Sequence, residues 1–158
     1  MRVTIIADAS FCPNTNGAGY GWWTASERGK QGGGGAMRDR VCSSSAAEMM
    51  ALVNALHHSI KFQLVQGGDH ILFQTDCMSA IDAFSGKRQQ LDKSERAAKK
   101  QIYDMKKQHG LTYSFRHVKG HTNRTEARYV TNNLCDQRAK AGMRLARERF
   151  GGLYGETK

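Results

Sequence analysis

Short apolar runs alternate along this chain with longer segments in which apolar residues recur every three to four positions. Residues 2–8 are rich in Val, Thr and Ile, a composition typical of a buried β-strand, and the run HILFQT at residues 70–75 predicts another strand. Residues 18–26 predict a second strand and residues 36–42 a third. Residues 111–118 alternate between apolar and polar side chains, which predicts a half-buried strand near the end of the chain.

Helical periodicity fills the intervals between these strands. The clearest helix is predicted over residues 45–63, where Ser45 to Glu48 matches a capping box and apolar residues follow at helical spacing. Further helices are predicted at residues 78–84, 91–109 and 134–149. The glycine-rich stretch 31–35 is interpreted as a flexible turn. This order of elements predicts an α/β fold, a mixed sheet with helices packed on it.

Length and composition narrow the class of protein further. A chain of 158 residues is long enough for one domain with its own core, and no apolar run approaches the length of a membrane span. The first residues enter a strand pattern without the apolar segment of a signal peptide. Four cysteines, 30, 35 and 58 residues apart, form no C-x-x-C pair. We therefore expect reduced thiols, a cytoplasmic location and no membrane contact.

The net charge of +10 is concentrated in one half of the chain. Residues 1–84 hold 6 Lys/Arg against 7 Asp/Glu, whereas residues 85–149 hold 17 against 6. A basic half on a compact domain is either a solvated face or a surface for a polyanion, usually nucleic acid. An anionic membrane fits less well, because no basic stretch carries a Leu-rich or aromatic insertion face.

Two aspartates directly follow the apolar strands. Asp8 ends the first run and Asp76 follows the run at 70–75. Either residue alone has a structural interpretation, because aspartate often closes a strand and opens a turn. If the two strands are parallel neighbours, however, their carboxyl ends meet at one edge of the sheet, where open α/β sheets form their sites. Asp8 and Asp76 are then expected side by side.

Two further carboxylates have both a structural and a chemical interpretation. Glu48 can act as the third residue of its capping box, yet a helical wheel places it on the apolar face of its helix, toward the sheet. Asp136 is predicted in the opening of the last helix, where an acidic side chain also interacts favourably with the helix dipole.

Four carboxylates in one place would repel one another and take up protons unless cations neutralised them. Ligand sets made only of oxygen suit Mg²⁺ or Mn²⁺ better than zinc. Two such ions, about 3.5–4 Å apart, can hold the attacking and leaving oxygens of a phosphodiester displacement. Asp8, Glu48, Asp76 and Asp136 on a basic protein therefore indicate a nuclease that uses two Mg²⁺ ions, with Mn²⁺ as an alternative.

Several short motifs follow one another in a fixed order along the chain. They are Asp8-Ala9-Ser10, Gly19-Tyr20-Gly21, Ala47-Glu48-Met49, Thr75-Asp76-Cys77, Val118-Lys119-Gly120-His121 and Asn132-Asn133-Leu134-Cys135-Asp136. Each motif is weak alone, but their order and spacing between about residues 3 and 145 strongly resemble type 1 ribonuclease H (ribonuclease HI) in its single-domain form.

The resemblance implies a ribonuclease H-like fold, with a five-stranded mixed sheet whose strands 1 to 3 are antiparallel and helices on both faces. It implies an endonuclease that hydrolyses the RNA strand of RNA–DNA hybrids and leaves 5′-phosphate and 3′-hydroxyl ends. Carried over by motif, Asp8, Glu48, Asp76 and Asp136 would hold two metal ions. His121 would assist proton transfer or product release.

The resemblance also implies where the hybrid lies. Ser10, Asn14 and the segment Ser43, Ser44 and Ser45 would face its minor groove, where the 2′-hydroxyl distinguishes RNA from DNA. This chain departs from the family pattern in this region. Ser44 and Ser45 replace two asparagines, and Met78 replaces a glutamine. The segment between His121 and Asp136 is longer than usual, and the basic helix at 91–109 takes the place of a tryptophan-rich protrusion.

Two other functions fit parts of the pattern. A transposase, integrase or resolvase of the same fold would act on DNA, although its site usually ends in a glutamate and not in an aspartate such as Asp136. A non-catalytic nucleic-acid-binding module would usually have lost one or more carboxylates. We expect a monomer with a catalytic domain over residues 1–150, no separate hybrid-binding domain before it, and a flexible tail over residues 151–158.

Overall fold

The computed structural model describes residues 1–118 and 127–155, with side chains for residues 1–118 and 130–151. The elements are β1 (Arg2–Cys12), β2 (Gly17–Ser26), β3 (Gly29–Ala36), α1 (Ser44–Lys61), β4 (His70–Thr75), α2 (Met78–Ser85), α3 (Lys93–His109), β5 (Thr112–His117) and α4 (Ala127–Gly155). The five strands form one sheet in the order β3-β2-β1-β4-β5. β1, β2 and β3 pair antiparallel, and β4 and β5 run parallel to β1. The predicted mixed α/β fold is confirmed.

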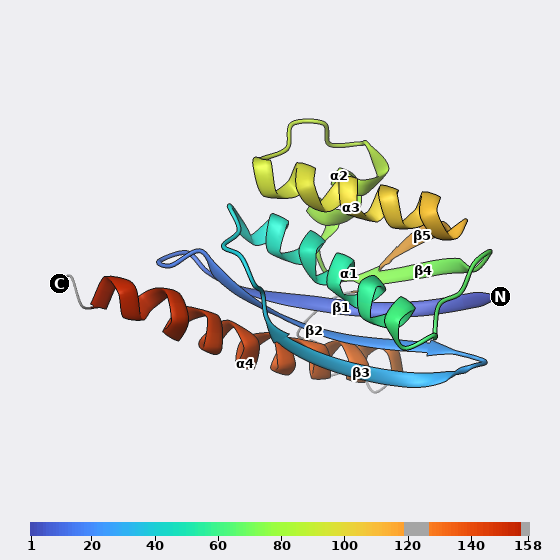
Figure 1. The fold of residues 1–158 in the computed structure, drawn as a ribbon, viewed down its shortest axis with the longest axis horizontal. Coiled ribbons are helices and arrows are strands. Elements are labelled where there is room, and N and C mark those ends of the chain that lie inside the picture. The colour runs from blue at the N-terminus through green and yellow to red at the C-terminus, as the bar shows by residue number, and fades with distance from the viewer. Residues whose placement is uncertain (119–126, 156–158) are drawn as a thin grey trace.

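Helices cover both faces of this sheet. Figure 1 shows α1, α2 and α3 on one side and α4 along the other, below β1, β2 and β3. The apolar core lies between the sheet and α1, where Ile5, Phe73, Met49 and Leu52 are fully buried. Because the Val3, Ile5 and Ala7 side chains point into this core, Asp8 and its alternate neighbours belong to the opposite side of β1.

The glycine run was predicted wrongly. Residues 32–35 are not a flexible turn but part of β3, which pairs with β2 over its whole length, and the strand expected at 36–42 ends at Ala36. Glycine is a poor strand former, so the local pattern indicated a turn. The backbone of α4 lies directly on this part of the sheet. A Cβ atom at Gly142 would stand 2.0 Å from the Gly35 carbonyl oxygen, so only glycine permits this approach.

Element ends also differ from the prediction. β1 continues to Cys12, so Asp8 lies within a strand and not at its end. The N-cap of α1 is Ser43, whose hydroxyl accepts from Ala46 N, so the predicted capping box from Ser45 to Glu48 does not form.

The last helix begins seven residues earlier than expected, and Asp136 is its tenth residue. The helix dipole interpretation of Asp136 is therefore wrong.

The end of α4 lies beyond the predicted domain boundary. The helix continues to Gly155, whereas the catalytic domain was expected to stop at residue 150. Residues 156–158 of the expected tail are outside the described part of the chain. No helix among the described residues has the length and apolar character needed to cross a lipid bilayer.

Candidate active site

Three carboxylates from distant parts of the chain converge beside the centre of the sheet. Asp8 lies on β1, Asp76 directly follows β4, and Glu48 projects from the second turn of α1. The parallel register pairs Ile6 with Gln74, which brings Asp8 and Asp76 together two residues further on. One oxygen from each of the three side chains lies within 4.8 Å of the others. The expected pairing of Asp8 and Asp76 is therefore present.

Asp8 is almost completely buried, with 2 % of its surface exposed. Its Oδ1 accepts from the backbone N–H of Ala9 at 3.0 Å, whereas Oδ2 is buried without a hydrogen-bond donor among the described residues. Burial raises the pKa of this carboxyl to about 8, and the charges of Asp76 and Asp136 add to the effect. A carboxylate in this setting stays ionised at neutral pH only if a cation is near it.

Glu48 faces the sheet, as its place on the helical wheel predicted. Its Oε1 accepts from Ala9 N at 3.3 Å, the same backbone group that Asp8 contacts. Its Oε2 is buried without a hydrogen-bond donor among the described residues. Burial, and after it the charges of Asp8 and Asp76, raise the pKa of Glu48 well above its ordinary value. Glu48 therefore belongs to the carboxylate cluster and has no part in capping α1.

Asp136 approaches the same cluster from α4. Its charge contributes to the raised pKa of Asp8, which places the two carboxyls close together. Lys140, one turn later in α4, forms an ion pair with Asp136, with 3.1 Å between Nζ and Oδ2. The four predicted carboxylates thus come from β1, α1, the end of β4 and α4.

A polar network around Ser45, at the start of α1, was not predicted. Ser45 Oγ donates to Glu95 Oε2 and accepts from Arg88 Nη2, both at 3.0 Å. Arg88 and Glu95 form an ion pair in which the glutamate side chain is 5 % exposed. The sequence carries one signal for this region, the capping box of Asp92 and Glu95 that starts α3. Nothing local indicates that Arg88 reaches α1.

The residues expected to contact a nucleic acid lie in different settings. Ser10 is half-buried on β1, and Asn14 is exposed in the turn after it. Ser43 caps α1 and donates to Asp92 Oδ2 at 2.7 Å, while Ser44 is exposed. The Ser45 hydroxyl is engaged in the network with Arg88 and Glu95. His121 falls outside the described residues, so its proposed role stays a prediction.

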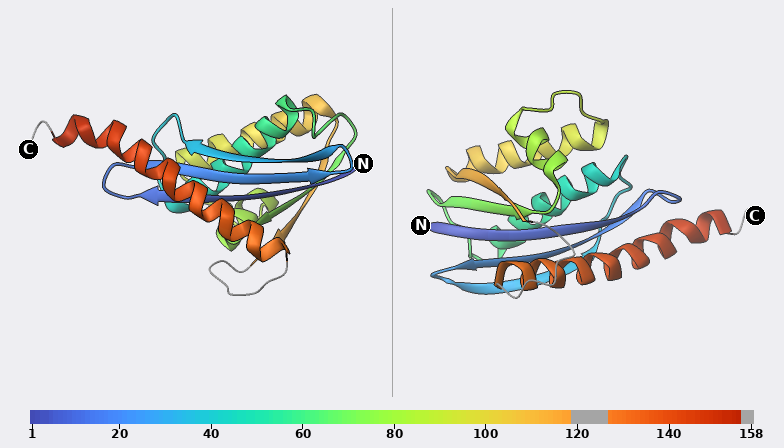
Figure 2. Two further views of the ribbon diagram at one scale, coloured as in Figure 1. Left: turned by 90° about the horizontal axis from the view of Figure 1, so that it is seen from below. Right: turned by 180° about the vertical axis from the view of Figure 1, so that it is seen from behind.

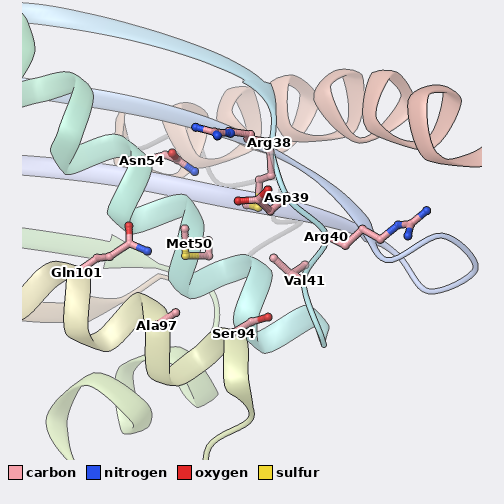
Figure 3. A pocket seen from close by; sticks show the side chains of 10 residues that line it. Arg38, Asp39, Arg40, Val41, Met50, Asn54, Ser94, Ala97 and Gln101 are labelled. Carbon is pink, nitrogen blue, oxygen red and sulfur yellow. The ribbon is translucent and has the colours of Figure 1, made fainter.

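A pocket of about 300 Å³ opens between α1, α3 and the loop after β3, away from the four carboxylates. Figure 3 shows its wall, with Met50 and Asn54 from α1, Gln101 from α3 and the loop residue Arg38. None of the four carboxylates lines it. The carboxylate cluster is therefore separate from this pocket.

Comparison with known proteins identifies the class of molecule that this fold and cluster define. The family model described as RNase H matches residues 1–144, and the chain therefore belongs to the RNase H family. Members of this family are endoribonucleases, and the three clustered carboxylates are the candidate catalytic groups. Comparison with curated proteins gives no match.

Solved structures share this fold along nearly the whole chain. RNase H1 from the halophilic archaeon Halobacterium salinarum aligns with a TM-score of 0.70 at 22% identity, covering 92% of this chain and 100% of that one. The N-terminal RNase H domain of a Mycobacterium tuberculosis protein aligns with a TM-score of 0.61 at 19% identity, covering 94% of this chain and 97% of that one. LC11-RNase H1, solved with an RNA/DNA hybrid, aligns with a TM-score of 0.65 at 15% identity, covering 91% of this chain and 98% of that one. At these identities the likeness shows the fold.

Proposed function

We propose that this protein is an endonuclease that hydrolyses the RNA strand of RNA–DNA hybrids and leaves 5′-phosphate and 3′-hydroxyl ends. The observation that carries the proposal is the convergence of Asp8, Glu48 and Asp76 within 4.8 Å in a chain of the RNase H family. LC11-RNase H1, which has the same fold, was solved in complex with an RNA/DNA hybrid. The basic half of the chain, net +11 over residues 85–149, supports a polyanionic substrate.

The donor set fits divalent cations, and we propose two Mg²⁺ ions held by Asp8, Glu48, Asp76 and Asp136. All four ligands are carboxylates, the hard oxygen donors that Mg²⁺ and Mn²⁺ prefer. Asp8 Oδ2 and Glu48 Oε2 are buried without hydrogen-bond donors among the described residues, as expected of atoms reserved for a metal ion. When bound, such ions activate a water nucleophile and stabilise the charge that develops on the scissile phosphate.

The protein's own groups prepare this site before any ion binds. The sheet fixes Asp8 and Asp76 on neighbouring parallel strands, and Ala9 N orients one oxygen each of Asp8 and Glu48. Lys140 forms an ion pair with the Asp136 carboxylate. We propose that His121 assists proton transfer or product release, and that Ser10, Asn14 and residues 43–45 contact the hybrid.

The test is a substrate panel with matched variants. Purified protein is incubated with labelled RNA–DNA hybrid, duplex DNA, duplex RNA and single strands, in Mg²⁺ and in EDTA. We expect Mg²⁺-dependent cleavage of the RNA strand of the hybrid, no cleavage in EDTA, and loss of activity in Asp76→Asn but not in Asp82→Asn on α2. Cleavage of duplex DNA would indicate a DNA-acting enzyme, and binding without cleavage would indicate a non-catalytic module.

We further propose a cytoplasmic monomer. The four free cysteines, Cys12, Cys42, Cys77 and Cys135, support a reducing compartment. Light scattering coupled to gel filtration tests the mass, and cell fractionation tests the location.

A further inference from the structure

Helix α4 is longer than the part of the chain that the RNase H family shares. The family match ends at residue 144, whereas α4 continues to Gly155. Figures 1 and 2 show the helix running along the sheet and past the turn between β1 and β2. The segment after residue 144 therefore adds a surface that the family match does not account for.

The far end of α4 is anchored to the rest of the molecule. Two guanidinium groups lie over the Phe150 ring, with Arg40 Cζ 4.7 Å and Arg149 Cζ 4.9 Å from its centroid. Arg149 Nη2 donates to the Met37 carbonyl at 2.5 Å. A Cβ at Gly17 would stand 3.1 Å from Phe150 Cδ2, so β2 packs closely on this ring. Figure 3 shows Arg40 directed away from the pocket, in keeping with these contacts.

A line of basic residues on α4 connects this anchored end with the active site. Lys140, Arg144 and Arg147 follow Asp136 at intervals of three and four residues, so all lie along one side of the helix. Asp136 lies close to Asp8, the seventh of the eleven residues of β1. The pKa of Cys12, the last residue of β1, is lowered foremost by hydrogen bonding with Thr15 and to a lesser degree by the charge of Arg147. Arg147 therefore lies near this end of the strand. This side of α4 therefore follows β1 from the active site to the hairpin.

The spacing of this line matches the dimensions of a nucleic-acid duplex. Arg147 is eleven residues beyond Asp136, a distance of about 16 Å along a helix axis. A duplex advances roughly 3.4 Å per base pair, so this distance corresponds to about five base pairs. Arg144 and Arg147 are exposed, and the helix from Lys140 to Phe150 carries four cationic side chains against Glu148 alone.

We propose that Arg144 and Arg147 form an extension track that binds backbone phosphates of the hybrid about five base pairs from the point of cleavage. The proposal rests on the proposed hybrid-cleaving function and adds a second binding surface to it. Guanidinium groups suit this role because each can donate two parallel hydrogen bonds to the oxygens of one phosphate and remains charged at all relevant pH values. Contacts of this kind position the duplex without reading its sequence.

The test measures binding to hybrids of three designs. A short hybrid ends close to the cleavage point on both sides, and two longer hybrids extend from it by about eight base pairs on one side or the other, enough to reach the track. Fluorescence anisotropy gives Kd at several salt concentrations, on an Asp76→Asn background that prevents cleavage. Wild-type cleavage of the hybrid is measured in parallel.

We expect Arg144→Gln/Arg147→Gln to lower the salt-dependence exponent by about two for only one of the two extended hybrids, because two phosphate contacts are lost. The control is Lys30→Gln/Lys61→Gln, which removes the same charge at the start of β3 and the end of α1, away from the far end of α4 (Figure 1). Melting curves of both variants establish that they fold.

Equal exponents for the Arg144/Arg147 variant and the parent on every hybrid would overturn the proposal, as would an equal loss in the lysine control. If the wild type cleaves the hybrid in that case, the proposed function stands without the track. If the extended hybrid binds through Arg144 and Arg147 but no RNA is cleaved, the track stands and the proposed function fails.

Discussion

Arg88 Nη2 donates to Ser45 Oγ at 3.0 Å and to the Ser79 carbonyl at 3.2 Å, so one guanidinium joins the first turns of α1 and α2. Ser45 precedes the site residue Glu48 by three residues, and Ser79 follows Asp76 by three. Burial alone would raise the pKa of Glu95, but hydrogen bonds led by that from Arg88 outweigh it and hold the pKa at about 2. The Arg88–Glu95 pair is therefore an ionised brace between the first turns of the helices that follow or carry two of the four carboxylates.

The first prediction concerns this brace. Arg88→Gln leaves Glu95 buried beside a neutral amide and should cost about 2 kcal/mol in unfolding free energy. Because the first turns of α1 and α2 lose their common anchor, kcat should fall about tenfold. Urea unfolding and steady-state kinetics measure the two effects, with exposed Arg2→Gln as control. The double variant with Glu95→Gln should cost less than the sum of the single changes, and an unchanged kcat in folded Arg88→Gln would contradict the positioning role.

The second prediction separates the chemistry of Glu48 from its contribution to stability. Glu48→Gln keeps the shape of the side chain but removes one of the charges that crowd Asp8 and Asp76. Activity in Mg²⁺ should fall at least 10²-fold, about 2.7 kcal/mol in activation free energy. The melting temperature in EDTA should stay the same or rise, because repulsion between carboxylates is relieved. Exposed Glu27→Gln is the control, and an active variant that melts earlier would remove Glu48 from the site.

The third prediction concerns the basic helix α3. Lys93, Lys100 and Lys107 are exposed and seven residues apart, so they lie along one side of the helix. If they bind phosphates of the substrate, changing all three to Gln should raise KM more than it lowers kcat. The exponent of the salt dependence of binding should fall by up to about three. Hybrid titrations between low and moderate salt measure this exponent, and a value equal to that of the wild type would place the substrate on another surface.

The fourth prediction tests the contact between α4 and the sheet. Gly142→Ala puts a methyl group 2.0 Å from the Gly35 carbonyl oxygen, so the helix must move or the protein must lose stability. We expect a loss of about 3 kcal/mol or more, together with lower activity because Asp136 lies on the same helix. Gly151→Ala is the matched control, since its Cβ would meet only Thr15 Cγ2 at 3.7 Å. The unfolding free energy of Gly151→Ala should equal that of the wild type or rise by up to about 1 kcal/mol, because alanine has the higher helix propensity.

The fifth prediction is a pH dependence outside the active site. Arg28 donates to both oxygens of the buried Asp69, at 2.5 and 3.0 Å, and foremost by this contact lowers the pKa of Asp69 from 3.8 to about 2. A lowered pKa contributes stability above the unfolded value, and that stability is lost as the pH falls from about 4 toward 2. Asp69→Asn should therefore cost about 1–2 kcal/mol at neutral pH, a fall in Tm of roughly 3–6 °C.

The pH dependence of the stability difference between wild type and Asp69→Asn serves as an internal control. The difference between wild type and Asp69→Asn should shrink as the pH approaches about 2, where the wild-type carboxyl is protonated. Asp104→Asn breaks the exposed pair of Asp104 and Lys100 and should cost only a few tenths of a kcal/mol. A difference between wild type and Asp69→Asn that stays constant down to the acid limit would mean that packing, and not the ion pair, sets the contribution of Asp69.

The sequence by itself predicted most of the helices and strands, with inexact ends, and three of the four carboxylate placements. Asp8 and Asp76 could be paired because an apolar run marks a buried strand and parallel strands direct their carboxyl ends to one edge. Glu48 could be turned toward the sheet because helical periodicity defines which side of α1 is apolar. These inferences succeed because each starts from a strand end or a periodicity that a short stretch of sequence records.

Only the tertiary structure decided the features that depend on distant neighbours. Residues 32–35 form a strand because they pair with β2, and Gly32 and Gly34 face α4, where an added Cβ would stand 2.5 and 3.0 Å from Arg138. No local pattern in the sequence records these contacts. Asp136 meets Asp8 from the third turn of α4 and not from its first, because α4 begins seven residues earlier than the local pattern indicated and packs along β1 and β2. Arg88 donates a hydrogen bond to Ser45, which is 43 residues away in the sequence. Local sequence reports intrinsic preference and periodicity, whereas these contacts arise only when packing brings separate elements to within a few ångströms of one another.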